Sequence, residues 1–534
     1  MPGVPLVLDR KGLGEAGPGD LAVVRNGRGR AKLERVLGKA SDIEVVLEGL
    51  LVHAGARTEF EPYTEPPQEG ERVDLRELLA VTIDPETAKD FDDALSIREE
   101  GDGLRAWVHI ADVSAYVPAG SPLDRGAADR AFTTYVPGLA AGMLPPQLAD
   151  DRCSLRPNED RLCVTVELPP SGEPRFYRSV IRSRARLTYG QAERREAEPD
   201  VAAALERIDR LTAAMRERRF ARGALRIESP EIAFELDGRG SVARAWSESE
   251  PTAHRLVEEL MISANEAVAR LLASRRREAL YRVHERPDPE AIELLLKRLA
   301  DLDVPTPPAP DGLSPALAAE VAAVTSERVM DYTGRSGRGR EAFPALVLRS
   351  LKQARYDPQN LGHSGLASTA YCHFTSPIRR YPDLVVHRAL LRELGLADDP
   401  VPANLDDLAE HTSGREREAA QVEYLAGELC LAWLLDDELY ERGWEEPFEG
   451  EITGLIGSGL FVRFGEVFEG FLPARRLEGD YFELNALATG LVGRRTKRAY
   501  RLGDPIEVRV QEIRRAEGKV ELSLAREPRR LSRG

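Results

Sequence analysis

The stretch VTIDPETAKDFDDALSI, residues Val81 to Ile97, places four aspartates within ten residues, namely Asp84, Asp90, Asp92 and Asp93. Carboxylates gathered so closely repel one another and require cations. Mg²⁺ prefers hard oxygen ligands and keeps positions open for water and a substrate phosphate. The stretch therefore favours metal-assisted attack on a phosphodiester.

A solvated acidic turn or a helix-capping run is the plain alternative. The flanks count against it, because Val81 to Ile83 form a short β-prone apolar run and Phe91 and Leu95 place apolar groups among the acids. An EF-hand calcium loop does not fit, since a loop that starts at Asp90 has Ala94 at its fifth position. We expect the aspartates to lie on a partly buried ledge that follows a strand.

Composition describes an ordinary globular protein. The chain has 534 residues with 42% hydrophobic and 31% charged residues, too many for one core, so we expect two to four domains. Four cysteines without CxxC spacing make disulfides and zinc unexpected, and no stretch approaches 18 apolar residues. The N-terminus lacks the apolar core of an export signal. These features predict a cytoplasmic protein without a membrane segment.

The net charge of −16 is unusual for a protein that binds RNA, because phosphate contacts by Lys and Arg dominate affinity. Residues 447–534 nevertheless carry 16 basic and 13 acidic residues, a net charge of +3. Three basic stripes occur elsewhere, and RNA tracking and solvated surface are equally good interpretations of each. They are Arg10 to Lys39, the strand face with Arg182, Arg184 and Arg186, and the helix side with Arg349, Lys352 and Arg355.

Patterning divides the chain into three expected units: residues 1–70, 71–446 and 447–534. In the first, strands at Asp20 to Val24 and Ala31 to Val36 precede a helix that Ser41 to Glu44 opens as a capping box, from about Asp42 to Ala54. In the second, Val201 to Arg222 and Ala253 to Arg276 read as long helices. Short alternating strands with glycines between them predict a small β-barrel in the third.

Asp84, followed after five residues by Asp90-Phe91-Asp92-Asp93, resembles the signature of the RNase II family catalytic domain, called RNB. Its members are Mg²⁺-dependent processive 3′-to-5′ exoribonucleases. Further segments match this family in the expected order and make the resemblance highly specific over about 370 residues. They are Val108 to Val113, Tyr135 to Gly138, Met143 to Pro145, Val257 to Asn265, Val283-His284 and Thr375 to Asp383.

The resemblance implies an α+β fold, in which a mixed sheet with surrounding helices forms the RNB domain, and it implies a mechanism. The four aspartates would hold one or two Mg²⁺ ions, for which Mn²⁺ could substitute, and the product would be a nucleoside 5′-monophosphate. Arg379 would stabilise charge in the transition state, while Arg380 suits a structural ion pair as well as a substrate contact. Tyr135 would stack on a base near the 3′ end, and Glu258 would contact the terminal nucleotide.

The C-terminal residues from Phe448 resemble the five-stranded OB-fold repeat first known from the large ribosomal protein S-one. Phe461, Phe464 and Phe471 are its aromatic candidates, and core packing is at least as good an interpretation as base stacking for each. We choose Phe461 and Phe471, with Arg509 nearby, as the stacking face. The expected partner is single-stranded RNA, bound by a monomer.

Two departures from the family pattern bear on function. Ile227 stands where a phenylalanine usually faces the tyrosine across the bases, so the base clamp differs. The N-terminal region is shorter than two cold-shock domains, and a shortened barrel and a winged-helix type of domain both remain open for it. A wider entrance would favour hairpins with a 3′ overhang, although the ending EPRRLSRG lacks the lysine-rich tail of RNase R.

Two other functions compete with the exoribonuclease. The first is an RNA-binding regulator on a catalytically silent RNB scaffold, whose mark would be the loss of one or more aspartates. The second is an RNA-binding translation or transcription factor, which would leave the aspartates unexplained. His109, within an apolar strand, reads as a core histidine rather than a ligand.

Overall fold

The computed structural model describes residues 16–25, 31–57, 59–63, 67, 70–101, 103–227, 231–248, 252–308, 312–477 and 479–525. Part of the expected Arg10 to Lys39 stripe lies outside these residues. Within them, no helix is long and apolar enough to cross a membrane.

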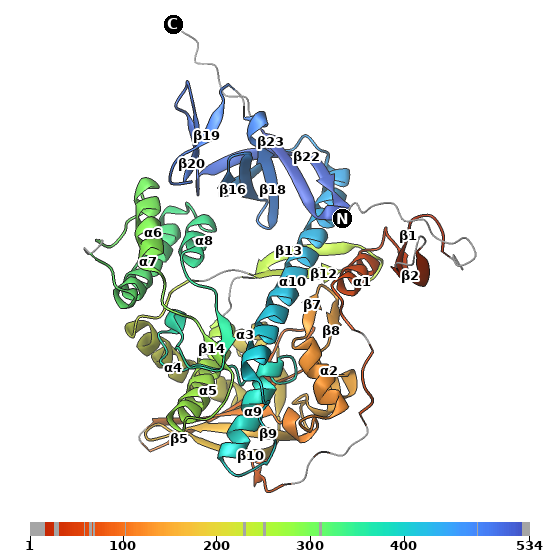
Figure 1. The fold of residues 1–534 in the computed structure, drawn as a ribbon, viewed down its shortest axis with the longest axis vertical. Helices are drawn as coiled ribbons and strands as arrows, with labels where there is room; N and C mark the ends of the chain where they lie inside the picture. The colour runs from red at the N-terminus through yellow and green to blue at the C-terminus, as the bar shows by residue number, and fades with distance from the viewer. Residues whose placement is uncertain are drawn as a thin grey trace.

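A seven-stranded mixed sheet forms the base of the molecule, at the bottom of Figure 1. Its central strands pair antiparallel, and the short edge strands β11 and β3 pair parallel with β4 and β10. The strands, in spatial order, are β11 (Ala185–Leu187), β4 (Val81–Ile83), β5 (Asp93–Glu100), β6 (Gly103–Ala111), β9 (Asp160–Leu168), β10 (Arg175–Arg182) and β3 (Val73–Asp74).

Both faces of this sheet are buried. Val108 and Val166 belong to one cluster with the helices α4 (Pro199–Ala221), α5 (Thr252–Ser274) and α9 (Tyr381–Glu393). The opposite face packs in a second cluster with α2 (Pro122–Arg130), the π-helical turn η3 (Gln147–Arg152) and the start of α10 (Leu405–Arg442). Burial on both faces explains why the middle of β6 and of β9 is mostly apolar, while charged residues stand near the strand ends.

Helix α10 is 38 residues long and links the sheet to the C-terminal barrel (Figure 1). One apolar cluster joins its second half to α1 (Ile43–His53), to the hairpin of β12 (Glu231–Leu236) and β13 (Val242–Glu248), and to the barrel core. The core therefore continues across residue 446. Removing the barrel would expose apolar residues of α10.

The barrel closes in the order β16-β17-β18-β23-β22. Its strands are β16 (Phe448–Ile456), β17 (Gly459–Phe464), β18 (Phe468–Pro473), β23 (Lys519–Leu524) and β22 (Pro505–Arg514). A separate sheet of β19 (Phe482–Leu484), β20 (Gly490–Gly493) and β21 (Ala499–Arg501) is inserted between β18 and β22. The α+β architecture with a five-stranded barrel is confirmed.

Three smaller groups complete the fold. The first is a group of three helices with its own apolar core, namely α6 (Pro289–Asp301), α7 (Pro315–Ser336) and α8 (Ala342–Arg349). Two paired segments are β7 (Thr134–Val136) with β8 (Leu139–Ala141), and β14 (Tyr281–Val283) with β15 (Arg355–Asp357). The remaining short elements are β1 (Asp20–Arg25), β2 (Lys32–Lys39) and α3 (Tyr189–Arg194).

Three local expectations need correction. Asp42 alone caps α1, since its side chain accepts from the Glu44 N–H, so the helix begins at Ile43 without the expected capping box. Arg182, Arg184 and Arg186 do not share a strand, because β10 ends at Arg182 and β11 begins at Ala185. Residues 349–355 are not one helix, because α8 ends at Arg349.

Ion pairs account for the last correction. Lys352 lies 3.2 Å from Asp288 and 3.6 Å from Glu285, and Arg355 opens β15 while it pairs with Glu285 and Asp357. The two side chains thus hold α6 to the β14–β15 pair.

Candidate active site

The aspartates lie on the connection between two neighbouring strands. Asp84 follows β4, and its N–H donates to the Leu187 carbonyl at 3.0 Å, while Asp93 opens β5. Ser154 anchors the loop between them, because its Oγ accepts from the Phe91 N–H and donates to the Lys89 carbonyl. Antiparallel pairing of β4 and β5 brings both ends of the aspartate stretch to one edge of the sheet.

Burial makes Asp84, Asp92 and Asp93 harder to ionise, and repulsion by neighbouring aspartates adds to this effect at Asp84 and Asp92. Burial raises the pKa of Asp92 well above its usual range. Burial, with the charge of Asp93 next in effect, raises the pKa of Asp84 to about 8. Burial also raises the pKa of Asp93 to about 6. A bound cation would stabilise the ionised form of these carboxylates.

The donor set fits a divalent cation in its chemistry. Asp84 Oδ2 and Asp92 Oδ2 are both buried without a hydrogen-bond partner among the described residues. Hard carboxylate oxygens of this kind suit Mg²⁺. In the described part of the chain, however, no three acidic, histidine or cysteine side chains are arranged as a ready metal site. Holding an ion through three of the aspartates would therefore require side-chain rotation.

The segment Thr375 to Asp383 closes over the aspartates. The Ile378 N–H donates to Asp92 Oδ1 at 2.8 Å, which fixes the turn on the cluster. Arg379 Nε then lies 3.5 Å from Asp92 Oδ2, with 44% of its side chain exposed. Arg379 thus faces the cluster and remains accessible.

Arg380 has a different environment. Its Nη2 donates to Asp383 Oδ1 at 2.7 Å, and only 18% of its side chain is exposed. Asp383 also accepts from the Ser376 N–H, so the ion pair braces the turn that carries Arg379. These contacts favour the structural interpretation of Arg380.

Tyr135 reaches the cluster from the β7–β8 hairpin. Its phenolic O–H donates to Asp90 Oδ2 at an O–O distance of 2.5 Å, and 38% of the residue is exposed. Its backbone N–H donates to Glu423 Oε1 at 2.9 Å. Glu423 lies mid-way along α10, and burial raises its pKa. No local motif indicates this long-range contact.

Tyr189 is a second residue that the sequence analysis missed. It begins α3, where Thr188 and Gln191 form a capping box. Its ring stacks on His254 with centroids 3.6 Å apart, and burial together with the charges of Asp93 and Asp84 raises its pKa. The sequence analysis did not single out this helix start, and only the fold places the ring beside the aspartates.

The other candidate residues lie on separate elements. Glu258 on α5 is 44% exposed, and its Oε1 lies 3.6 Å from Arg219 Nη2. Ile227 is partly buried against the cluster of α6, α7 and α8. His109 is fully buried between Ser96 and Thr165, which confirms it as a core histidine.

The barrel aromatics separate into core and surface. Phe464 is 1% exposed and fills the barrel. Phe461 and Phe471 face each other across β17 and β18 with ring centroids 5.2 Å apart, and both are half-buried. Arg509 keeps 37% of its side chain exposed. The chosen pair is therefore a surface pair.

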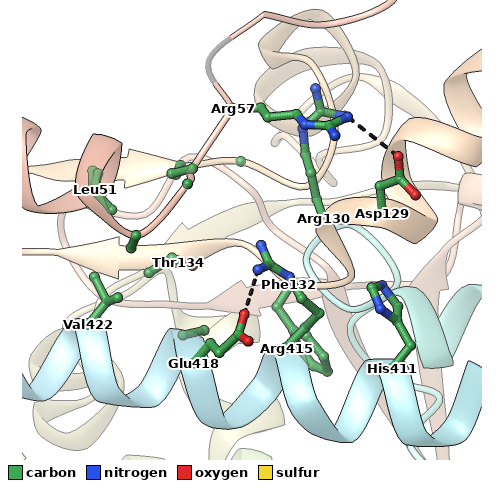
Figure 2. Close-up of a pocket in the computed structure, with 16 residues that line it drawn as sticks. Leu51, Arg57, Asp129, Arg130, Phe132, Thr134, His411, Arg415, Glu418 and Val422 are labelled. Carbon is green, nitrogen blue, oxygen red and sulfur yellow. Dashed lines mark hydrogen bonds and ion pairs between the residues drawn. The ribbon is translucent and has the colours of Figure 1, made fainter. Parts of the chain in front are cut away.

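A cavity of about 310 Å³ lies beside the β7–β8 hairpin, between α1, α2 and α10 (Figure 2). Its charged lining is largely paired, since Arg57 lies 3.4 Å from Asp129 and Arg415 lies 2.5 Å from Glu418. We assign it no part in the aspartate site.

Comparison with known proteins decides the family. Residues 72–395 match the RNB domain, and residues 445–525 match the S1 RNA binding domain. The chain belongs to the RNB domain family. The RNB match includes the four aspartates and Arg379, and the S1 match includes Phe461 and Phe471.

Two curated RNB relatives are ribonuclease R proteins. The Escherichia coli (strain K12) protein is 36% identical over 523 residues, covering 89% of this chain and 62% of the relative. The Aquifex aeolicus protein is 38% identical over 471 residues, covering 85% and 65%. The chain thus spans somewhat less than two thirds of the length of these relatives.

Solved RNB structures share the fold. Mycoplasma genitalium RNase R in complex with ribose methylated single-stranded RNA has a TM-score of 0.87 at 25% identity, covering 97% of this chain and 85% of that one. Yeast Ssd1, a pseudonuclease, has a TM-score of 0.67 at 18% identity, covering 88% and 61%. The fold therefore occurs with and without nuclease activity, and the side chains must decide between the two.

Proposed function

We propose that this chain is a hydrolytic, processive 3′-to-5′ exoribonuclease that degrades single-stranded RNA to nucleoside 5′-monophosphates. The observation that carries the proposal is the intact set of four aspartates at one sheet edge, faced by Arg379 at 3.5 Å from Asp92. A silent RNB scaffold has no use for buried, mutually repelling carboxylates, which cost stability without a cation.

Each residue then has a role. Asp84, Asp90, Asp92 and Asp93 would hold Mg²⁺, or Mn²⁺ in its place, and the ion would activate water and neutralise the phosphate. Arg379 would stabilise the charge that grows on the phosphoryl oxygens. A nucleophilic water would attack the terminal phosphodiester, and the 3′-oxygen of the preceding nucleotide would leave.

Substrate positioning would involve residues around this centre. Tyr135 would stack on a base, while its phenolic group orients Asp90. Glu258 would contact the terminal ribose, where a 2′-hydroxyl distinguishes RNA from DNA. Phe461 and Phe471 would hold the strand farther from the site, and Ile227 would pack against a base without π-stacking. Likeness to an RNase R in complex with single-stranded RNA supports the choice of RNA. We extend the proposal to hairpins that carry a 3′ overhang.

One experiment tests the proposal. RNA labelled at its 5′ end is incubated with the protein and Mg²⁺, and a denaturing gel follows the products over time. Loss from the 3′ end, with long RNA and short end products present together, is the expected pattern. Binding without hydrolysis under Mg²⁺ and Mn²⁺ would favour the silent regulator instead.

A further inference from the structure

The three-stranded insertion in the barrel carries a second charged surface. Its turn between β20 and β21 has the sequence RRTKR, residues 494–498, and all five residues are exposed. We call residues 494–498 together with Tyr481 the basic turn. Residues 480–501 hold five basic and two acidic residues, a net charge of +3 within a chain of net charge −16.

The turn is built to a fixed shape. Asp480, whose side chain is 2% exposed, accepts from the N–H groups of Tyr481, Arg495 and Thr496 and from the Thr496 hydroxyl. These hydrogen bonds hold the pKa of Asp480 well below its usual range. Gly493 is required beside it, because a Cβ there would lie 2.7 Å from Asp480 Oδ2.

Several basic side chains of the basic turn are accessible to a ligand. Among the described residues, Lys497 and Arg498 have no acidic partner within ion-pair distance, while Arg495 is 81% exposed at 3.5 Å from Asp480. Tyr481 is 66% exposed, and the Arg494 guanidinium lies 4.9 Å from its ring centroid. Arg494 also pairs with Glu483, and the Arg498 guanidinium lies 4.8 Å from the Tyr500 ring centroid, so within the described turn the accessible charge without an acidic partner is that of Lys497 and Arg498. An exposed aromatic ring beside accessible cations is the combination that binds single-stranded nucleic acid through stacking and phosphate contacts.

The insertion is fixed to the catalytic block. Thr489 hydrogen-bonds to Asp301, Arg501 lies 3.0 Å from Asp303, and Arg298 donates to the Leu487 carbonyl at 2.9 Å. Figure 1 shows β19 and β20 at the end of the molecule opposite the seven-stranded sheet. A strand whose 3′ end lies at the aspartates could therefore reach the basic turn only with nucleotides on its 5′ side.

We propose that the basic turn binds the phosphate backbone of single-stranded RNA, on the 5′ side of the segment that occupies the catalytic block. This inference rests on the proposed function, because it takes the polarity of the strand from it. It adds a contact surface that lies outside the barrel and its Phe461–Phe471 pair. An RNA too short to span from the aspartates to the turn gains nothing from it.

The test measures binding in an Asp92→Asn background with a ladder of single-stranded RNAs extended from the 5′ end. Lys497→Ala/Arg498→Ala is compared with Arg207→Ala/Arg210→Ala, a control that removes two arginines from α4, one half-buried and one exposed. The basic-turn variant should bind long RNA about tenfold more weakly and flatten its salt dependence by about 1.4 logarithmic units per decade of salt. The control should match the background protein at every length.

A second pair of variants separates stacking from charge. Tyr481→Ala should weaken binding of long RNA about fivefold without altering the salt dependence, and Tyr481→Phe should restore it. Wild-type affinity of Lys497→Ala/Arg498→Ala for long RNA would overturn the proposal and leave an acidic protein surface as the partner. An equal penalty at all RNA lengths would overturn the placement on the 5′ side. Failure of the wild type to hydrolyse RNA would instead count against the proposed function.

Discussion

Substitution of Asp92 can separate the effect of its negative charge from the effect of its hydrogen bond. Its Oδ1 accepts the Ile378 N–H, which an asparagine carbonyl can still accept, whereas its charge faces Arg379. Asp92→Asn should lower turnover at least about a hundredfold, because an electrostatic contribution of several kcal/mol at the reacting centre is lost. RNA affinity should remain.

Single-turnover hydrolysis and equilibrium binding would be measured on the same preparation. Asp209→Asn on α4 is the matched control, since Asp209 pairs with Arg195 far along the sequence from the cluster. Near-normal turnover of Asp92→Asn at saturating RNA would contradict the assignment of the aspartates.

Tyr135 combines two roles that substitution can resolve. Tyr135→Ala removes the ring and should lengthen the final oligomer, because a stacked base contributes about 1 to 3 kcal/mol that matters most when few other contacts remain. Tyr135→Phe removes only the hydrogen bond to Asp90 and should lower the rate about five- to tenfold with an unchanged end product. Denaturing gels of the end products distinguish the two roles. Identical ladders for the wild type, Tyr135→Ala and Tyr135→Phe would show that Tyr135 is a packing residue.

Two carboxylates meet at the interface between α10 and the barrel. Burial, and then the charge of Glu469 on β18, raises the pKa of Glu428 on α10 to about 7. An unfolded glutamate titrates near pH 4.3, so the folded state is favoured most below that pH and loses this advantage as pH rises through about 7.

Glu428→Gln should therefore stabilise the protein by about 1 kcal/mol at pH 8 and have little effect near pH 4. Thermal unfolding across this pH range provides the measurement. Glu410→Gln, an exposed position on the same helix, should follow the wild type throughout. A stabilisation of Glu428→Gln that is equal at both pH values would contradict the repulsion argument.

Elements with strong local signals were predictable, and those set by distant partners were not. The long helices expected at Val201 to Arg222 and Ala253 to Arg276 agree closely with α4 and α5, because their apolar periodicity is sustained. Spacing at every third residue misled at Lys352, whose place is set by Glu285 and Asp288 on another element.

The candidate site shows the same limit. The four aspartates could be found because one loop carries them. Tyr189 and Glu423 could not, because they approach the loop from α3 and α10 without a local motif. The sequence also could not show that Arg380 is taken up by Asp383 while its neighbour Arg379 stays accessible.

At the scale of the whole molecule, the barrel is a structural partner as well as the proposed RNA-binding unit. Leu434 and Leu435 of α10 share an apolar cluster with Leu460 and Leu472 of the barrel. Removal of residues from Phe448 onward should therefore lower the unfolding temperature in addition to weakening long-RNA binding. Calorimetry and a salt series of binding would show both effects.

Phe461→Ala/Phe471→Ala is the cleaner comparison, because both rings lie on the barrel surface. This variant should lose affinity for long RNA and unfold near the wild-type temperature. An unfolding temperature of the truncated chain equal to that of the intact protein would show that α10 does not depend on the barrel.

The long helix α10 also has a metric consequence. Its 38 residues extend about 57 Å, and about 29 Å separates Glu423, which holds Tyr135, from the end at Arg442 beside the barrel. Because a helix hardly stretches, α10 acts as a ruler that sets the distance between the aspartate cluster and the barrel. Under the proposed function, we therefore expect digestion to stop at the same size for every RNA sequence.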